Sequence, residues 1–295
     1  MKYTFKEFQT EYPNDAACLA TLMEVNYGGT EITCPACGVE KAQFHPMNTR
    51  KAYACQECGH HIYPCAGTIF NKSRTPLTKW FFAMYLMTST RSGVAAKELE
   101  RALGVTYKCA WRMAHELRKL MANADHGGPL SGHVEIDETW IGGVNRKGGK
   151  GHGKRLSKKT IVMGLVERDG KIRAGTIPDD SKFTMKPIVL ENVKPGSVVD
   201  TDGHLSYVDL GQTFKHTAIN HAAGEYARGV HHTNTIEGHW SQLKRSIKGT
   251  HVHISAKHAW KYIGEFNYRR NYRASHYGML TRLVSAFALP RLQET

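Results

Sequence analysis

Two cysteine pairs constrain the fold of this chain more than any other feature of its sequence. They lie in CPACG at 34–38 and in CQECG at 55–59, and a glycine directly follows each pair. Glycine permits a tight turn that points backbone N–H groups at thiolates, and the interval between the pairs suits two short strands. We therefore predict a tetrahedral, structural Zn²⁺ site, with iron as the minor alternative. Its ligands would be Cys34, Cys37, Cys55 and Cys58.

The charge of the chain predicts a polyanionic partner. The formal net charge is +14, and no basic amphipathic anchor or lipidation signal appears, which favours nucleic acid over a membrane. The N-terminus has no apolar signal core, and the longest apolar run, Trp80–Met87, is too short to span a bilayer. We expect a cytoplasmic protein, in which paired cysteines argue for a metal and against disulfides.

A helical region follows the cysteine pairs. Pro76 suits the start of one helix, and the segment 92–121 breaks at Gly104 before a second start at Thr106, a typical N-cap. This pattern predicts a helix-turn-helix, with an ordinary helical hairpin as the alternative. Tyr107, Lys108 and Arg112 are best placed for a DNA groove, and Arg118 and Lys119 for phosphate.

Strands are predicted from residue 133 onward. Residues 133–140 alternate, which places Glu135 and Asp137 on one face and Ile136 and Glu138 on the other. Segments 160–167 and 171–177 flank an Asp-Gly dipeptide that favours a hairpin turn. After a helix near 184–193, the segment GSVVDTDG predicts another strand that ends at Asp202.

Residues 231–248 predict a helix with two distinct stripes. Ile236, Trp240, Leu243 and Ile247 form a buried stripe, and the neighbouring stripe holds Glu237, Ser241, Lys244 and Lys248. Solvated surface charges are the plain interpretation of Glu237 and Lys244. However, one carboxylate on this helix and one on each of two strands is an arrangement that holds two divalent metals for attack on a phosphodiester.

The order of elements predicts an α/β multidomain protein with a ribonuclease H-like catalytic domain. We expect an N-terminal helix and zinc ribbon at 1–70, a helix-turn-helix region at 71–124, the catalytic domain at 130–280 and a C-terminal tail at 281–295. A helix at 257–273 would close the catalytic domain. The segment 142–159 is glycine-rich and cationic, so we expect a mobile loop in which Lys147, Lys154 and Arg155 are candidate phosphate contacts, with a merely solvated loop as the alternative.

With these motifs in view, the chain resembles bacterial insertion-sequence transposases of the DDE type, in the zinc-ribbon, ISXO-like group. The likeness covers nearly the whole chain and includes CPACG, CQECG, VEIDETWIGG, TDGHLSY and HTNTIEGHWSQLKRSIKG in that order. It implies an Mg²⁺-dependent enzyme, for which Mn²⁺ can substitute, that cuts double-stranded DNA at inverted-repeat ends and joins the 3′-hydroxyls to a target. It also implies a homo-oligomer on DNA in the bacterial cytoplasm, associated with the nucleoid.

The resemblance assigns roles by position. Asp137 of IDET, Asp202 of TDG and Glu237 of TIEGHW match the catalytic acids that hold magnesium, and Asn234 competes with Glu237 for the third place. We favour Glu237 because seven residues separate it from Lys244, which puts both on one helix face. Lys244 matches the basic residue that binds phosphate, with Arg245 beside it, while His232 and Asn234 are candidates for orienting the DNA or the nucleophile.

Two other functions compete with this one. His251 and His253 form a His-hydrophobic-His triplet followed by Tyr262, Tyr268 and Tyr272, as in nucleases that form phosphotyrosine. That interpretation leaves the three carboxylates without a role. A former transposase retained as a DNA-binding regulator is the non-enzymatic alternative, and the presence of all three acids speaks against it.

Overall fold

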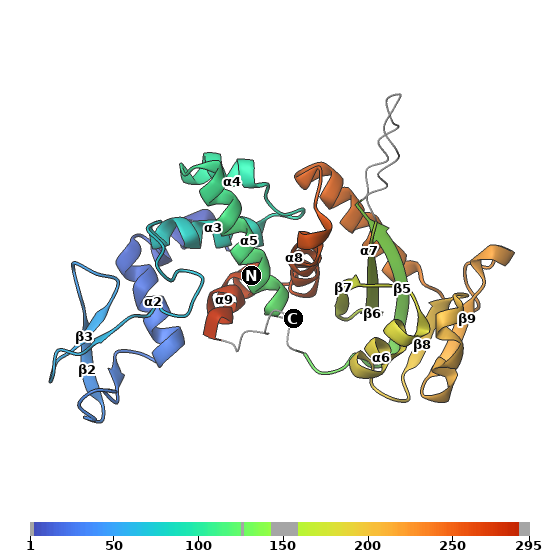
Figure 1. The fold of residues 1–295 in the computed structure, drawn as a ribbon, viewed down its shortest axis with the longest axis horizontal. Coiled ribbons are helices and arrows are strands. Elements are labelled where there is room, and N and C mark those ends of the chain that lie inside the picture. Colours follow the sequence, from blue (N-terminus) through green and yellow to red (C-terminus); the bar gives the residue numbers. More distant parts are fainter. Residues whose placement is uncertain (1–2, 125–126, 143–158, 289–295) are drawn as a thin grey trace. The chain divides into compact units, whose positions relative to one another are not determined.

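The computed structural model describes residues 3–124, 127–142 and 159–288 of the chain. The chain divides into two compact units (Figure 1). One unit comprises Met1–Ala124 together with Tyr272–Thr295, and the other comprises Asp125–Asn271. Residues 272–288 therefore belong with the first unit, whereas the sequence predicts residues 272–280 as part of the catalytic domain.

Short helices and a small antiparallel sheet begin the first unit. Helix α1 spans Phe5–Glu11, and α2 spans Asp15–Tyr27, with the side chain of Asn14 accepting a hydrogen bond as the α2 N-cap. The sheet has the order β1-β2-β3-β4. Its strands are β1 (Glu31–Ile32), β2 (Ala42–Pro46), β3 (Tyr53–Cys55) and β4 (His61–Ile62). The β1–β2 hairpin carries the first cysteine pair in its turn, and the β3–β4 hairpin carries the second.

The remainder of the first unit is helical. Helix α3 spans Leu77–Ser89, α4 spans Ala96–Leu103 and α5 spans Tyr107–Asn123. Helix α4 ends at Gly104, which adopts φ +58°, and the Thr106 hydroxyl accepts the Cys109 N–H at the start of α5, as the sequence predicts. Helix α9 (His276–Ser285) and the turn η5 (Ala286–Ala288) complete this unit.

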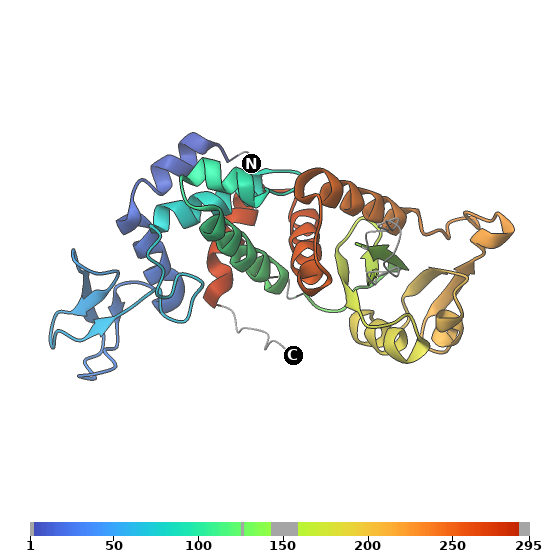
Figure 2. The ribbon, with the colours of Figure 1, turned by 45° about the horizontal axis from the view of Figure 1, so that its top comes forward.

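A mixed five-stranded sheet with the order β7-β6-β5-β8-β9 forms the centre of the second unit (Figures 1 and 2). Strands β5 (His133–Ile141), β6 (Thr160–Glu167) and β7 (Ile172–Ile177) are antiparallel neighbours. Strand β8 (Val198–Asp202) pairs parallel with β5, and β9 (Lys215–Ile219) pairs parallel with β8. The predicted strands are thus present within a residue or two, whereas β9 was not predicted.

Each face of this sheet has its own apolar core. Helix α6 (Lys182–Asn192) and the 3₁₀ segment η1 (Leu205–Gln212) cover one face, where Val134 and Ile136 of β5 point. Helices α7 (Asn234–Ser246) and α8 (Ala259–Asn271) cover the other face, where Ile236, Trp240 and Leu243 are buried. The predicted buried stripe of α7 therefore packs on the sheet. A π-helical turn, η3 (Ile247–His251), extends α7.

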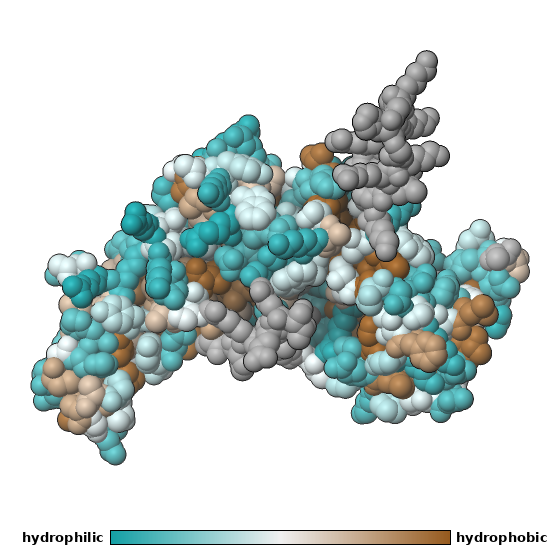
Figure 3. All heavy atoms as spheres, viewed as in Figure 1, coloured by the Kyte–Doolittle hydropathy of each residue, from teal (hydrophilic) through white to brown (hydrophobic). Residues whose placement is uncertain are grey.

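Some large apolar side chains of the second unit stay at the surface (Figure 3). Phe183 of α6 is 89% exposed, and Leu205 and Val208 of η1 are 81% and 66% exposed. In the described part of the chain, no helix combines the length and the apolar character that crossing a membrane requires.

Candidate active site

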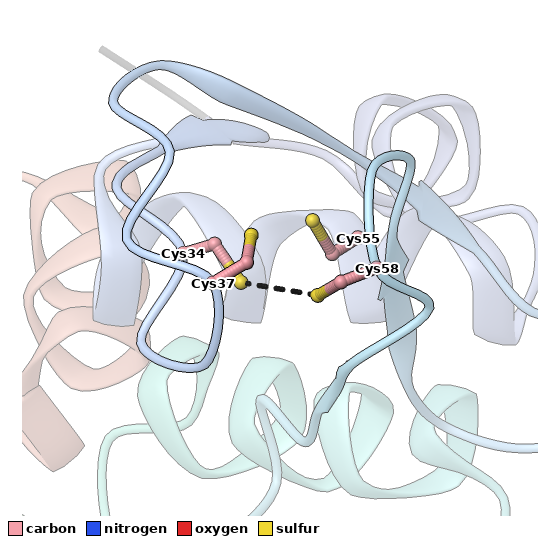
Figure 4. A group of neighbouring side chains, drawn as sticks. All are labelled: Cys34, Cys37, Cys55 and Cys58. Atoms are coloured by element: carbon pink, nitrogen blue, oxygen red, sulfur yellow. Dashed lines mark hydrogen bonds between the residues drawn. The ribbon is translucent and has the colours of Figure 1, made fainter.

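The four paired cysteines converge in the ribbon of the first unit (Figure 4). Their sulfur atoms all lie within 4.8 Å of one another, and Cys34 Sγ is 3.7 Å from Cys58 Sγ. Gly38 and Gly59 adopt positive φ angles of +73° and +71° and donate their N–H groups to the carbonyls of Cys34 and Cys55. The backbone N–H of Cys37 lowers the pKa of the Cys34 thiol, which favours the thiolate that a metal needs. Four sulfur donors in this arrangement fit Zn²⁺.

A group of carboxylates lies where β5 and β8 run side by side in the second unit. Glu135 pairs with Asp200 in the parallel register of the two strands. Asp137 and Asp202 each lie two residues further along, and they share that face of the sheet because side chains alternate along a strand. This is the face that α7 covers, since the Trp240 indole N–H of α7 donates to Asp137 Oδ2 at 2.9 Å.

The carboxylates at this end of the strands repel one another. Burial, and then the charges of Glu138 and Asp202, raise the pKa of Asp137 to about 7, although the Trp240 hydrogen bond opposes the shift. Asp202 accepts the His204 N–H at 2.9 Å. Within the described residues, no ion pair neutralises Asp137 or Asp202. A divalent cation would relieve this repulsion directly.

Glu138 is an additional acid near this site. Its side chain points to the opposite face of β5, is buried, and accepts a 2.6 Å hydrogen bond from the Tyr207 hydroxyl of η1. Burial raises the pKa of Glu138, and the charge of Asp202 adds to the shift. The alternation of β5 predicts Glu138 on the face away from Asp137, but no role was predicted for it. The only feature of the sequence that draws attention to Glu138 is its position next to Asp137.

The structure does not draw Glu237 into contact with the two strand acids. Its side chain is 46% exposed, accepts the Thr233 hydroxyl at 2.8 Å and lies 3.7 Å from Nε2 of His221. Asp137, Asp202 and Glu237 are not among the groups, in the residues described, whose potential ligand atoms lie within 4.8 Å of one another. Asn234 and Lys244, both on α7, are exposed to solvent.

A buried charge network lies beneath these residues. The Glu135 carboxylate is inaccessible to solvent and accepts the N–H groups of Thr235 and Ile236 at the start of α7, at 2.8 and 3.1 Å. Arg168, from the turn between β6 and β7, donates to Glu135 at 2.8 Å and to Asp200 at 2.9 Å. No sequence motif indicates a role for Glu135, Arg168 or Asp200.

His232 belongs to this network. Its backbone N–H donates to Asp200 at 3.1 Å, and its ring Nδ1 lies 3.2 Å from Oε1 of Glu135. These contacts place His232 beside Asp200 and Glu135. Each of these two acids precedes a candidate metal ligand by two residues on its strand.

His133, Asp200 and His231 also gather closely enough to resemble a metal site. Their potential ligand atoms lie within 4.8 Å of one another. However, Asp200 already accepts hydrogen bonds from both histidines, from Arg168 and from the His232 backbone. The guanidinium supplies the positive charge that a metal would bring, so we interpret this group as an internal ion pair.

The candidate DNA contacts in the first unit differ in exposure. Tyr107, at 50% exposed, and Lys108 stand at the exposed start of α5, and the Arg112 guanidinium lies 5.6 Å from the centroid of the Trp80 ring. The phosphate role expected for Arg118 is wrong, because that side chain is 1% exposed and donates to the carbonyl of Val94. Lys147, Lys154 and Arg155 lie outside the described residues. Arg245 of α7 is exposed.

Comparison with known families identifies the class of protein that combines this cysteine ribbon with this α/β unit. Residues 13–61 match the transposase zinc-ribbon domain, and residues 129–271 match the ISXO2-like transposase domain. The two matches fall on the cysteine ribbon and on the unit that contains the acids. The chain belongs to the ISXO2-like transposase family.

Individual relatives agree with this assignment. A protein in transposable element ISH50 of Halobacterium salinarum is 28% identical over 257 residues, which cover 81% of this chain and 85% of that protein. A transposase-like protein of Haemophilus influenzae is 32% identical over 103 residues, which cover 34% of this chain and 81% of that protein.

Solved structures resemble the chain only distantly. The Mos1 strand transfer complex matches 63% of this chain and 74% of that chain at 13% identity, and a pre-cleavage Mos1 transpososome matches 64% and 76% at 12% identity. Both have a TM-score of 0.25, a value too low to support an inference about the fold.

Proposed function

We propose that this transposase binds the inverted-repeat ends of an insertion sequence, cleaves the DNA there with two divalent metals and joins the 3′-hydroxyl ends to target DNA. The observation that carries this proposal is the placement of Asp137 and Asp202 on one face of adjacent parallel strands. The family of the chain supplies the reaction class, and this pair supplies the site.

The donor set of the proposed site fits a hard cation. Asp137 and Asp202 offer carboxylate oxygens, which Mg²⁺ and Mn²⁺ prefer, and burial among like charges gives the site a deficit of positive charge. Glu237 would complete the set. When bound there, Mg²⁺ supplies activation of a hydroxyl nucleophile and neutralisation of the leaving oxygen.

The chain's own residues would bind and orient the DNA around this site. The exposed ammonium of Lys244 and the guanidinium of Arg245 lie on α7 after Glu237, where each can hold a phosphate. Trp240 holds Asp137 by its indole N–H and excludes water from one side of that carboxylate. Asn234, exposed at the start of α7, is the neutral alternative to Glu237 as third ligand.

The architecture supports two finer assignments. A sheet with three antiparallel strands followed by two parallel ones, with helices on both faces, is the arrangement of a ribonuclease H-like domain. Helices α4 and α5, joined through Gly104, fit a helix-turn-helix whose second helix presents Tyr107 and Lys108 to a DNA groove. Assembly into a homo-oligomer on DNA stays a prediction.

The test of the catalytic assignment is cleavage of a duplex taken from the DNA that flanks the reading frame. Asp137→Asn, Asp202→Asn and Glu237→Gln should each abolish cleavage and joining while leaving DNA binding intact, because each removes a carboxylate from one metal site. Glu191→Gln is the matched control, since Glu191 is an exposed carboxylate on α6 at the other face of the sheet. The proposal fails when the strand-acid variants cleave as the control does.

Two variants distinguish Glu237 from Asn234 as the third metal ligand. We expect Glu237→Gln to lose cleavage in Mg²⁺ and to recover slightly in Mn²⁺, and Asn234→Ala to keep measurable activity, because only a carboxylate brings full negative charge to the cation. An active Glu237→Gln beside an inactive Asn234→Ala assigns the third position to Asn234. The contacts of Glu237 with Thr233 and His221 would then be structural.

The same assay separates the two competing functions. A DNA-binding regulator would bind the duplex without cutting it. A phosphotyrosine nuclease would leave a covalent adduct; of its three candidate tyrosines, Tyr268 is fully buried, whereas Tyr262 and Tyr272 are partly exposed. His251 and His253 lie in and just after the π-helical turn η3, and neither is on a strand of the sheet.

A further inference from the structure

Helix α7 begins directly over a buried carboxylate. Glu135 of β5 accepts the backbone N–H groups of Thr235 and Ile236 at 2.8 and 3.1 Å, and it also accepts the Thr235 hydroxyl at 2.8 Å. A negative charge at a helix N-terminus satisfies orphan N–H groups and interacts favourably with the helix dipole. Because Glu135 comes from the central strand, this contact fixes where α7 starts relative to the sheet.

Arg168 ties this carboxylate to a second buried one. Its Nε donates to Glu135 at 2.8 Å, and one terminal nitrogen donates to Asp200 of β8 at 2.9 Å. The same guanidinium donates to the backbone carbonyls of Val230 and, at 3.0 Å, His232, which lead into α7. One side chain from the β6–β7 turn therefore holds both strands and the entry to the helix.

Two histidines complete the hydrogen bonding of Asp200. Arg168 also donates to Nδ1 of His133 at 3.1 Å, so Nε2 of His133 carries the hydrogen that it donates to Asp200 at 2.6 Å. Nδ1 of His231 donates to the other Asp200 oxygen at 2.8 Å. Every charge in the network therefore has partners within the protein, as a buried ion pair requires.

The network stands in a fixed relation to the proposed metal ligands. Glu135 precedes Asp137 by two residues on β5, Asp200 precedes Asp202 by two residues on β8, and Thr235 precedes Glu237 by two residues on α7. On a strand, two residues along is the next side chain on the same face. The two strands are thus joined to each other one step before their ligands, and α7 is joined to them at its first turn. On a helix, two residues rotate the side chain by about 200°, so this contact fixes where α7 starts and leaves the Glu237 side chain on another side of the helix.

We propose that Glu135, Arg168 and Asp200, with Thr235 as their contact on α7, form a clamp that holds the start of α7, and with it Glu237, on the two strands that carry Asp137 and Asp202. These are positioning residues, and the inference rests on the proposed function of Asp137, Asp202 and Glu237. Residues that hold metal ligands in place typically contribute about 10–100-fold to metal affinity or activity. The clamp should therefore affect metal binding and the rate of cleavage more than it affects DNA binding.

The test uses the full chain and two clamp variants of different severity. Glu135→Gln keeps the size of the side chain but removes its charge, and Thr235→Val keeps the shape of the side chain but removes its hydroxyl donor. We expect Glu135→Gln to weaken Mn²⁺ binding, measured by electron paramagnetic resonance, and to lower the cleavage rate by about 10–100-fold with the KM for DNA unchanged. Thr235→Val should show the same pattern with a smaller loss.

A matched control separates positioning from stability. Val189→Ala creates a cavity under α6 on the opposite face of the sheet, and it should lower the unfolding temperature without changing Mn²⁺ affinity or the cleavage rate below that temperature. If Val189→Ala slows cleavage as much as Glu135→Gln does, the clamp acts only through stability and the inference is overturned.

The outcome also distinguishes the clamp from the proposed function. Wild-type Mn²⁺ affinity and cleavage rate in both clamp variants, beside an inactive Asp137→Asn, overturn the clamp and leave the metal site standing. An active Asp137→Asn overturns the proposed function and the clamp with it. Reduced Mn²⁺ affinity and rate in both clamp variants, with the control unchanged, support the positioning role.

Discussion

Replacement of Gly164 by alanine should displace the side chain that connects α7 to Asp137. Gly164 of β6 is the register partner of Asp137 on β5, and a Cβ atom added there would lie 2.5 and 2.6 Å from two ring carbons of Trp240. Carbon atoms in contact normally stay about 3.5–4.0 Å apart. The indole ring must therefore shift by about 1 Å, and Ile236, whose Cδ1 would lie 2.9 Å from the new Cβ, must shift less. We expect the shift of the ring to weaken its 2.9 Å hydrogen bond to Asp137.

The expected cost combines overpacking with the loss of this hydrogen bond. Overpacking of a core usually costs about 1–3 kcal/mol, and a hydrogen bond contributes about 1 kcal/mol. For a unit of this size each kcal/mol lowers the unfolding temperature by about 2–4 °C. We therefore expect Gly164→Ala to lower the melting temperature of the second unit by several degrees in calorimetry and to reduce cleavage.

A second-site change tests whether Trp240 is the cause. Trp240→Phe removes the two ring carbons nearest to Gly164, so the double variant should be more stable than the sum of the single losses implies. The indole donor is absent in that variant, and cleavage should stay low. Unaltered melting of Gly164→Ala, or strict additivity of the two changes, would refute the packing of Trp240 against Gly164.

Three further results are expected. Purified protein should contain about one Zn²⁺ per chain, and Cys55→Ser should lose it and unfold the ribbon; a folded ribbon without zinc by metal analysis would contradict this. DNA affinity should fall steeply with salt, and Lys108→Ala should weaken binding to the element's end more than binding to random DNA, whereas equal losses would mean backbone contact only. Burial lowers the pKa of His216, so the unfolded chain binds its proton first and stability should fall as pH drops below about 6.5; His216→Gln should make that dependence shallower in urea denaturation.

The sequence predicted the strands of the second unit because their patterns are strong and local. Strand β6 spans Thr160–Glu167, as predicted, and Asp169 adopts φ +58° in the turn that the Asp-Gly dipeptide indicates. Strand β9 was missed because Lys215–Ile219 pairs on one side only and has a weak apolar pattern. Helix α9 (His276–Ser285) was not predicted, because no motif was found after residue 273 and residues 281–295 were predicted as a tail.

The roles of individual acids depend on contacts that spacing does not show. The seven-residue interval from Glu237 to Lys244 places both on one face of α7, but that face lies beside the buried stripe, so Glu237 is half exposed instead of facing Asp137. Likewise, alternation places Glu135 with Asp137 on one face of β5, while only the partner Arg168, 33 residues from Glu135, shows that Glu135 serves the fold.

Two layers of acid on the same strands differ in what neutralises them. In the lower layer, Glu135 and Asp200 share the guanidinium of Arg168, and Glu135 also accepts the N–H groups of a helix start, so one positive charge and several hydrogen bonds stabilise the two carboxylates. In the upper layer, one side-chain step away, Asp137 accepts the Trp240 indole N–H and the Glu138 backbone N–H, and Asp202 accepts the His204 backbone N–H, and within the described residues no cationic side chain pairs with either acid. If the strands merely tolerated acids, both layers would be satisfied in the same way. The two layers are instead stabilised differently, and the pKa of Asp137 is raised by burial first and by the charges of Glu138 and Asp202 after it. The difference between the two layers agrees with the proposed metal site, because a divalent cation at the upper layer would offset the repulsion between Asp137 and Asp202.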